Sequence, residues 1–229
     1  MQQFKIMNKP TNYPIPDSPR PLSVSILLSC GLFGSIIFTV GYIIEATLTP
    51  GYSSLHRTIS DLELVKHGWL QSANFILLGL FTCLFAIGLR KELESGIGAR
   101  SLPALQLLVA LGLILTGIFI HEPLHTPSSM ISFISLVIGF FLFAKRFRGD
   151  ERWKGWATYS ILSGIFMMVF LSLFGFFKHS NGPIGLYERL VVATRSLWSF
   201  LFIIRLLRGV RLTPRHHSAL PAEQISHQR

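Results

Sequence analysis

Six apolar stretches, each long enough to cross a lipid bilayer, constrain this chain more than any other feature of its sequence. A helix of about 20 residues with few charges matches the hydrocarbon core of a membrane. We predict membrane-spanning helices at residues 22–47, 69–89, 102–120, 128–144, 157–177 and 186–207. Only 14% of the 229 residues are charged, against about 25% in a soluble domain. The predicted fold class is all-α, a single bundle of six transmembrane helices.

Basic residues are distributed unequally between the two predicted sides of the membrane. Sixteen of the 21 Lys and Arg residues fall in the N-terminal tail, the loops after the second and fourth spans, and the C-terminal segment. Because Lys and Arg resist translocation, both termini are predicted to be cytoplasmic. We attribute the net charge of +10 to this topology and to contact with anionic membrane lipids, not to nucleic-acid binding.

Three regions follow from this pattern. A Pro-rich cytoplasmic tail is expected at residues 1–21, the transmembrane domain at 22–207, and a basic cytoplasmic tail at 208–229. The polar composition of the last segment predicts disorder. Short loops and the lack of recognisable organellar signals are typical of a bacterial inner-membrane protein, and we expect that location.

Small residues recur within the spans at helical spacing. Gly112 and Thr116 are four residues apart, as are Ser160 and Gly164, and the first span contains Gly34. Such residues let helices approach closely in a membrane. We expect them to pack the six spans together. A different hypothesis is that the faces of spans one and three bind another membrane protein, or that the chain forms a homo-oligomer.

Polar residues gather on the predicted outer side. His67, Gln71 and Asn74 share one face of the second span, because they are spaced i, i+4 and i+7. Asn and Gln within a span usually form hydrogen bonds between helices, but together with the outer acid Asp61 these residues could also line a pocket.

Arg195 lies near the middle of the sixth span, and a charge at that depth is costly unless it is paired or hydrated. Its candidate partners are Glu188, seven residues earlier on the same face, and Glu45 in the first span. Arg195 is therefore either one half of a structural ion pair or a contact for an anionic ligand. In the second case, a polar pocket that opens outward would hold a lipid headgroup or a small polar solute.

Histidines are concentrated on the same side. A catalytic zinc site needs three protein ligands, and His121 and His125, with His179 or His67, could supply them, while Asp61 or Glu122 acted as base. The same imidazoles could instead be solvated, or could sense pH. No cofactor is established by the sequence, and zinc is the one that it suggests.

Several short motifs occur in a characteristic order. They are Pro50-Gly51-Tyr52, Ile59-Ser60-Asp61-Leu62, Asn74-Phe75, Gly79-Leu80, Gly117-Ile118-Phe119, Glu122-Pro123, Gly185-Leu186, Glu188-Arg189-Leu190 and Trp198. In order and spacing, the chain resembles the six-span family filed as domain of unknown function 998 over most of residues 22–207. The resemblance implies a helical membrane bundle with polar motifs on the outer side, and it implies no particular activity.

The leading hypothesis is a non-enzymatic multi-pass membrane protein whose outward-facing pocket binds a lipid headgroup or small polar solute. The predicted ligand-binding residues are Glu45, Asp61, His67, Gln71, Asn74, Glu188 and Arg195. The alternatives are an intramembrane zinc-dependent lipid hydrolase and an accessory subunit of another membrane protein.

Overall fold

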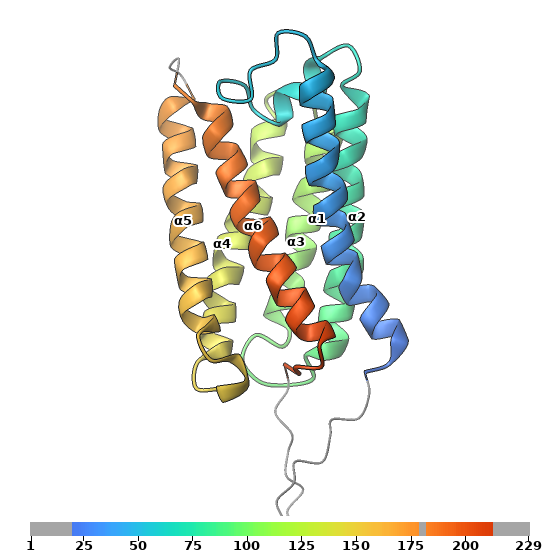
Figure 1. Ribbon diagram of the computed structural model, residues 1–229, viewed down its shortest axis with the longest axis vertical. Helices are drawn as coiled ribbons and strands as arrows, with labels where there is room; N and C mark the ends of the chain where they lie inside the picture. Colours follow the sequence, from blue (N-terminus) through green and yellow to red (C-terminus); the bar gives the residue numbers. More distant parts are fainter. Residues whose placement is uncertain (1–19, 179–181, 213–229) are drawn as a thin grey trace, which may run out of the picture.

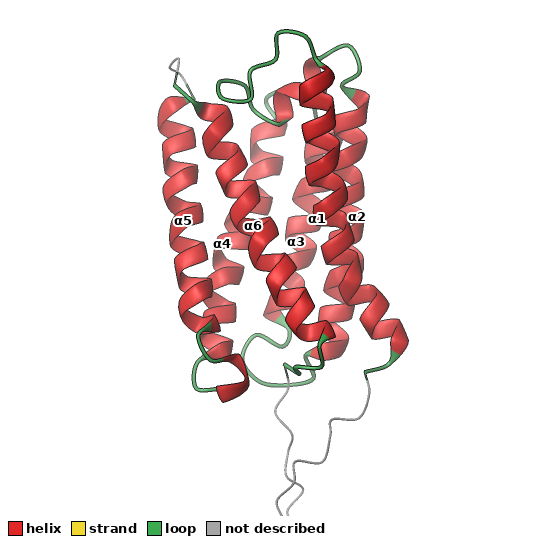
Figure 2. Cartoon of the chain, in the orientation of Figure 1, coloured by secondary structure: helices red, strands yellow, loops and turns green. Residues whose placement is uncertain are grey.

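The computed structural model of the chain describes residues 20–178 and 182–212, and it shows six long helices and no strand among those residues (Figures 1 and 2). Each of the six helices is long and apolar enough to cross a membrane. Their bounds are α1 Leu22–Leu48, α2 Trp69–Glu92, α3 Ser101–Ile118, α4 His125–Phe147, α5 Trp156–Phe177 and α6 Ile184–Leu207. Two short 3₁₀ helices lie in loops, η1 at Ser60–Leu64 and η2 at Glu151–Trp153. The all-α prediction of six spans is confirmed.

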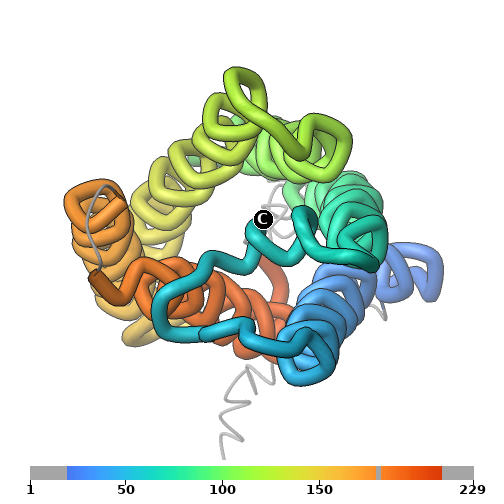
Figure 3. The backbone as a smooth tube through the Cα atoms, turned by 90° about the horizontal axis from the view of Figure 1, so that it is seen from above, coloured from blue at the N-terminus to red at the C-terminus, as the bar shows by residue number. Residues whose placement is uncertain are grey.

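The six helices form a closed ring in chain order. Each helix packs against the next one in the chain, and α6 returns to pack against α1 (Figure 3). The two ends of the described chain lie at one end of the bundle, as an even number of spans requires (Figure 1). We call this the terminal end. There, the Arg20 side chain and the Leu212 backbone N–H both donate to Glu92, the last residue of α2. The opposite end holds residues 49–68, the connection between α1 and α2, which we call the cap segment and which contains η1.

The predicted boundaries differ from the observed ones by one to three residues at eight of the twelve helix ends, including both ends of α4. α2 continues to Glu92, beyond the predicted residue 89, and ends in the basic pair Arg90 and Lys91, whose long side chains can reach the polar interface. α4 begins at His125 instead of residue 128, so this histidine belongs to the first turn of a helix. The predicted tails at 1–21 and 208–229 fall almost entirely outside the described residues.

Close packing between helices depends on the small residues that the sequence indicated. A Cβ atom on Gly112 of α3 would lie 2.4 Å from the Ser132 hydroxyl oxygen on α4, so only glycine allows this approach. A Cβ on Gly34 of α1 would lie 2.6 Å from Phe81 of α2. On α5, the Ser160 hydroxyl accepts a hydrogen bond of 3.0 Å from the Trp198 indole of α6. These faces are therefore occupied by neighbouring helices of the same chain.

Aromatic side chains fill the interior of the bundle toward the terminal end. Trp198 packs against Phe143 with ring centroids 4.8 Å apart and against Phe202 at 4.7 Å. Phe147 stacks on Trp153 of η2 at 4.5 Å. Large rings at these separations contribute more than their buried area alone. The core is thus densely packed in this half, and the open space lies in the other half, beneath the cap segment.

Candidate ligand-binding site

The cap segment crosses the end of the ring and is fastened to α6 (Figure 3). The Arg189 guanidinium of α6 donates to the Arg57 carbonyl at 2.9 Å and to the Tyr52 hydroxyl at 2.7 Å. The Leu186 backbone N–H donates to the Leu55 carbonyl at 3.2 Å. Because Arg189 is held by acceptors on the cap segment, it acts as a clamp between α6 and this loop.

A buried carboxylate completes this attachment. Glu188 of α6 accepts a hydrogen bond from the backbone N–H of Ile59, the residue that immediately precedes η1. A negative charge at a helix N-terminus is favourable because the first N–H groups have no partner within the helix. Ile59 and Leu62 are fully buried and pack into a core cluster with Phe38 of α1 and with α2. The cap segment is therefore a packed element that covers the end of the bundle.

Beneath the cap segment lies a cavity of about 470 Å³, to which all six helices contribute. This volume is in the usual range for small-molecule sites. Its wall is mainly apolar, and includes Phe75, Leu78, Val109, Leu113, Leu136 and Met167. Arg195 also lines the wall, eleven residues into α6, and so lies about 16 Å from the start of that helix at 1.5 Å per residue. The cavity thus reaches toward the middle of the bundle.

Arg195 has no carboxylate within 4.0 Å among residues 20–178 and 182–212, and its guanidinium donates to the Thr82 hydroxyl at 3.2 Å. The expectation of an ion pair with Glu188 or Glu45 is therefore wrong. Glu188 lies two turns nearer the cap segment and is used there, while Glu45 is buried and has one carboxylate oxygen without a hydrogen-bond partner. A guanidinium at this depth retains hydrogen-bonding capacity toward a ligand.

The other acids of the cavity wall lie near the cap end and already have partners. Asp61 accepts from the Thr58 backbone N–H at 2.8 Å. Glu122 accepts a hydrogen bond from Thr126 and lies 3.8 Å from the Lys178 ammonium. The Thr126 hydrogen bond, assisted by Lys178, lowers the pKa of Glu122. These carboxylates are consequently stabilised locally and do not neutralise Arg195.

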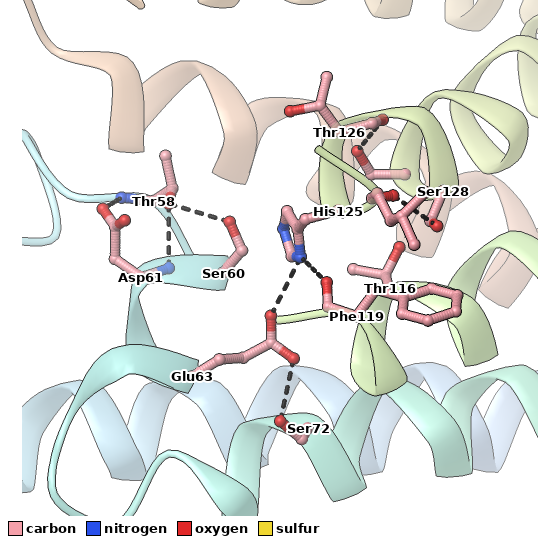
Figure 4. A network of polar contacts seen from close by, with 12 residues as sticks. Thr58, Ser60, Asp61, Glu63, Ser72, Thr116, Phe119, His125, Thr126 and Ser128 are labelled. Carbon is pink, nitrogen blue, oxygen red and sulfur yellow. Dashed lines mark hydrogen bonds and ion pairs between the residues drawn. The ribbon is translucent and has the colours of Figure 1, made fainter. Parts of the chain in front are cut away.

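A second buried acid, Glu63 of η1, joins the cap segment to two other parts of the bundle (Figure 4). Its side chain is 0% exposed, accepts from the Ser72 hydroxyl of α2 at 3.1 Å, and lies 3.6 Å from Nδ1 of His125. That nitrogen also lies 2.9 Å from the Phe119 carbonyl. Burial raises the pKa of Glu63 to about 8, although the Ser72 hydrogen bond opposes this effect.

Only part of the predicted ligand-binding set lines the cavity. Asp61, Glu188 and Arg195 do so. The predicted stripe on α2 does not: Asn74 donates to the Phe38 carbonyl of α1 at 3.0 Å, and Gln71 is buried beside it. The remaining members also lie away from the wall, namely His67, which is exposed, and Glu45.

The predicted zinc ligands are not assembled in the described part of the chain. His121 and His125 both line the cavity, but no group of three His, Cys, Asp or Glu residues in 20–178 and 182–212 could hold a metal ion. His179 lies outside the described residues. Nδ1 of His125 lies 2.9 Å from the Phe119 carbonyl, which leaves Nε2 as the nitrogen of this imidazole that could bind a metal. Because the predicted set includes His179, the zinc site stays a prediction.

A family model described as a protein of unknown function, DUF998, matches residues 32–205. The chain belongs to the DUF998 family. The resemblance seen in the sequence is thus confirmed. No curated protein and no solved structure matches this DUF998 chain.

Motifs that carried the resemblance meet around the cap segment of this DUF998 protein. Tyr52 and Ile59 come from two motifs of the first long loop, and Glu188 and Arg189 come from the sixth span; the contacts above join them. Sequence reasoning did not assign roles to Arg189 or Glu63. The contacts of both residues depend on how the 20-residue cap segment folds over the bundle. A periodic sequence pattern does not predict the conformation of such a loop.

Proposed function

We propose that this DUF998 protein is a non-enzymatic multi-pass membrane protein that binds an anionic lipid or a small anionic solute in the cavity beneath the cap segment. The single observation that carries the proposal is Arg195, which lines an apolar cavity without a carboxylate partner in the described ranges. A buried cation is costly in a membrane, and a bound anion would offset that cost.

The surroundings of Arg195 favour an anion attached to an apolar body. The wall between the cap segment and Arg195 is formed mainly by aliphatic and aromatic side chains, which gain from contact with apolar ligand surface. A charge-assisted hydrogen bond to a guanidinium is stronger than a neutral one, and the planar fork can bind two oxygens side by side. An amphiphilic anion therefore matches the site better than a purely polar solute.

The charge distribution supports an outward-facing cap segment. Cationic side chains at the terminal end include Arg20, Arg146, Arg205 and Arg211, and the side richer in Lys and Arg is normally cytoplasmic. We propose that both termini face the cytoplasm, so that the cavity is reached from the outer leaflet or the external solution. A bacterial inner membrane remains our expectation for the location.

Binding of three matched eight-carbon probes to protein in lipid nanodiscs tests the proposed function. Octanoate and octyl phosphate are anionic, whereas octanol is neutral, and native mass spectrometry can count each bound molecule. At least one anionic probe is expected to bind about tenfold or more tightly than octanol, and Arg195→Gln should abolish that preference. Lys66→Gln is the matched control, because Lys66 is an exposed cation of the cap segment that does not line the cavity. If the three probes bind alike to the wild-type protein, the proposal is refuted.

Neither alternative function gains support from a specific contact. The zinc hydrolase would need ligands that the described residues do not bring together. An accessory subunit that used the small-residue faces of α1 and α3 would have to displace α2 and α4, which cover Gly34 and Gly112.

A further inference from the structure

The hydroxyl groups of α3 and α4 that line the cavity already donate their protons within the protein. Thr116 on α3 donates its hydroxyl proton to the Gly112 carbonyl at 2.8 Å, and Ser132 on α4 donates to the Val109 carbonyl at 2.8 Å. Ser129, about one turn nearer the start of α4, likewise donates to a carbonyl at 2.9 Å. A hydroxyl has one proton to donate. These wall hydroxyls are therefore left only as acceptors, which an anion cannot use.

Even the hydroxyl that contacts Arg195 follows this pattern. Thr82 donates to the Leu78 carbonyl at 2.7 Å and accepts from Arg195 at 3.2 Å. A guanidinium has five N–H donors in a rigid fork. With one of them directed at Thr82, the remaining N–H groups can still form a two-point contact with a ligand.

The donor count distinguishes between classes of anion. A carboxylate has two oxygens, and a guanidinium fork can bind both of them. A phosphate monoester has three terminal oxygens, and the third would face apolar side chains or hydroxyls without a free proton. A buried polar atom that lacks its hydrogen bond loses its solvation without compensation. The wall therefore disfavours phosphate relative to carboxylate.

The charged groups of the cavity wall also favour a carboxylate over a phosphate. In the described residues that line the cavity, the other charged groups are Lys178, Asp61, Glu122 and Glu188, together with two histidines. All of these lie closer to the cap end than Arg195, and Glu188 is about 10 Å above it along the helix. One guanidinium balances a single negative charge. A doubly charged headgroup would leave one negative charge unbalanced in the low-dielectric cavity, where Glu188 would repel it.

We propose that the ligand is a monocarboxylate with an apolar body, with its carboxylate on Arg195 and its body against the aliphatic and aromatic wall. This inference rests on the proposed function and narrows its ligand to one class. The carboxylate could come from a fatty acid of the bilayer or from a small apolar acid in water, and the chemistry of recognition is the same for both.

The probes named above also test this choice of headgroup, because octanoate and octyl phosphate share the same chain. In wild-type protein, octanoate should bind at least tenfold more tightly than octyl phosphate at pH 8, where the phosphate is a dianion. This comparison depends on no variant. Arg195→Lys keeps the charge but loses the fork, and should reduce octanoate binding at least tenfold. A competition experiment identifies the source of the carboxylate. Hexadecanoate is supplied in the nanodisc bilayer, and its ability to displace octanoate supplied in water is measured.

Each result has one meaning. Tight octanoate binding with weak octyl phosphate binding supports the inference, and displacement of octanoate by hexadecanoate assigns the carboxylate to a bilayer fatty acid. Octyl phosphate binding as tightly as octanoate overturns the carboxylate assignment while the proposed anion site stands. Equal binding of octanoate, octyl phosphate and octanol overturns the proposed function itself.

Discussion

Replacing Glu188 by Ala removes the acceptor that fastens the cap segment to α6. The backbone N–H of Ile59 would then lose its partner, and Ile59 is fully buried. Leaving a buried backbone N–H without a hydrogen bond costs about 1–3 kcal/mol. At 1.4 kcal/mol for each factor of ten, opening of the cap segment should become about 5- to 100-fold more favourable.

Hydrogen–deuterium exchange of the peptide spanning residues 53–66, in nanodiscs, measures this opening directly. Glu188→Ala should increase exchange in this peptide by about 5- to 100-fold while the centres of α2 and α3 stay protected. Glu188→Gln retains one acceptor oxygen and should have a smaller effect. Glu122→Ala is the matched control, because it removes an exposed acid of the cavity mouth. Unchanged exchange in Glu188→Ala would refute the reasoning that this carboxylate holds the cap segment.

Three further predictions follow from the structure. Burial raises the Glu63 pKa from 4.5 to about 8, so the folded state binds this proton more tightly than the unfolded state does. The stability of the protein should therefore fall as pH rises between those two values. In Glu63→Gln, the thermal-unfolding midpoint should depend less on pH over that range. Gly112→Ala should lower the free energy of unfolding, measured with denaturant, by about 1–3 kcal/mol, because the added methyl group overpacks the contact with α4. Gly175→Ala should not show this loss, because no atom lies within 4 Å of the added Cβ. If the proposed non-enzymatic function is right, elemental mass spectrometry should find no zinc that depends on His121 and His125; stoichiometric zinc lost on their replacement would support the hydrolase alternative instead.

The bundle was predictable because each helix must match the bilayer. Length and hydropathy placed all six spans, and the small residues at Gly34, Gly112 and Ser160 correctly indicated close packing. Errors were confined to helix ends, such as the start of α4 at His125. There a polar residue can belong either to a loop or to a first helical turn, and composition alone does not decide between them.

The site was only partly predictable, because periodicity gives the face that residues share but not what that face contacts. Gln71 and Asn74 do lie together on α2, but their side chains meet α1 instead of the cavity. The depth of Arg195 followed from its position in an apolar run. Its lack of a carboxylate partner did not, because Glu188 accepts a hydrogen bond from the Ile59 backbone N–H, and only the fold of the cap segment brings that group to α6.

The most direct test of the central claim locates a bound carboxylate relative to Arg195. Solid-state NMR on nanodisc-embedded protein, with ¹³C in the octanoate carboxyl group and ¹⁵N in the arginine guanidinium groups, reports whether the two are in contact. We predict a dipolar contact at hydrogen-bonding range in wild-type protein that is lost in Arg195→Gln and kept in Lys66→Gln. Bound octanoate without that contact, or with a contact that survives in Arg195→Gln, would contradict it.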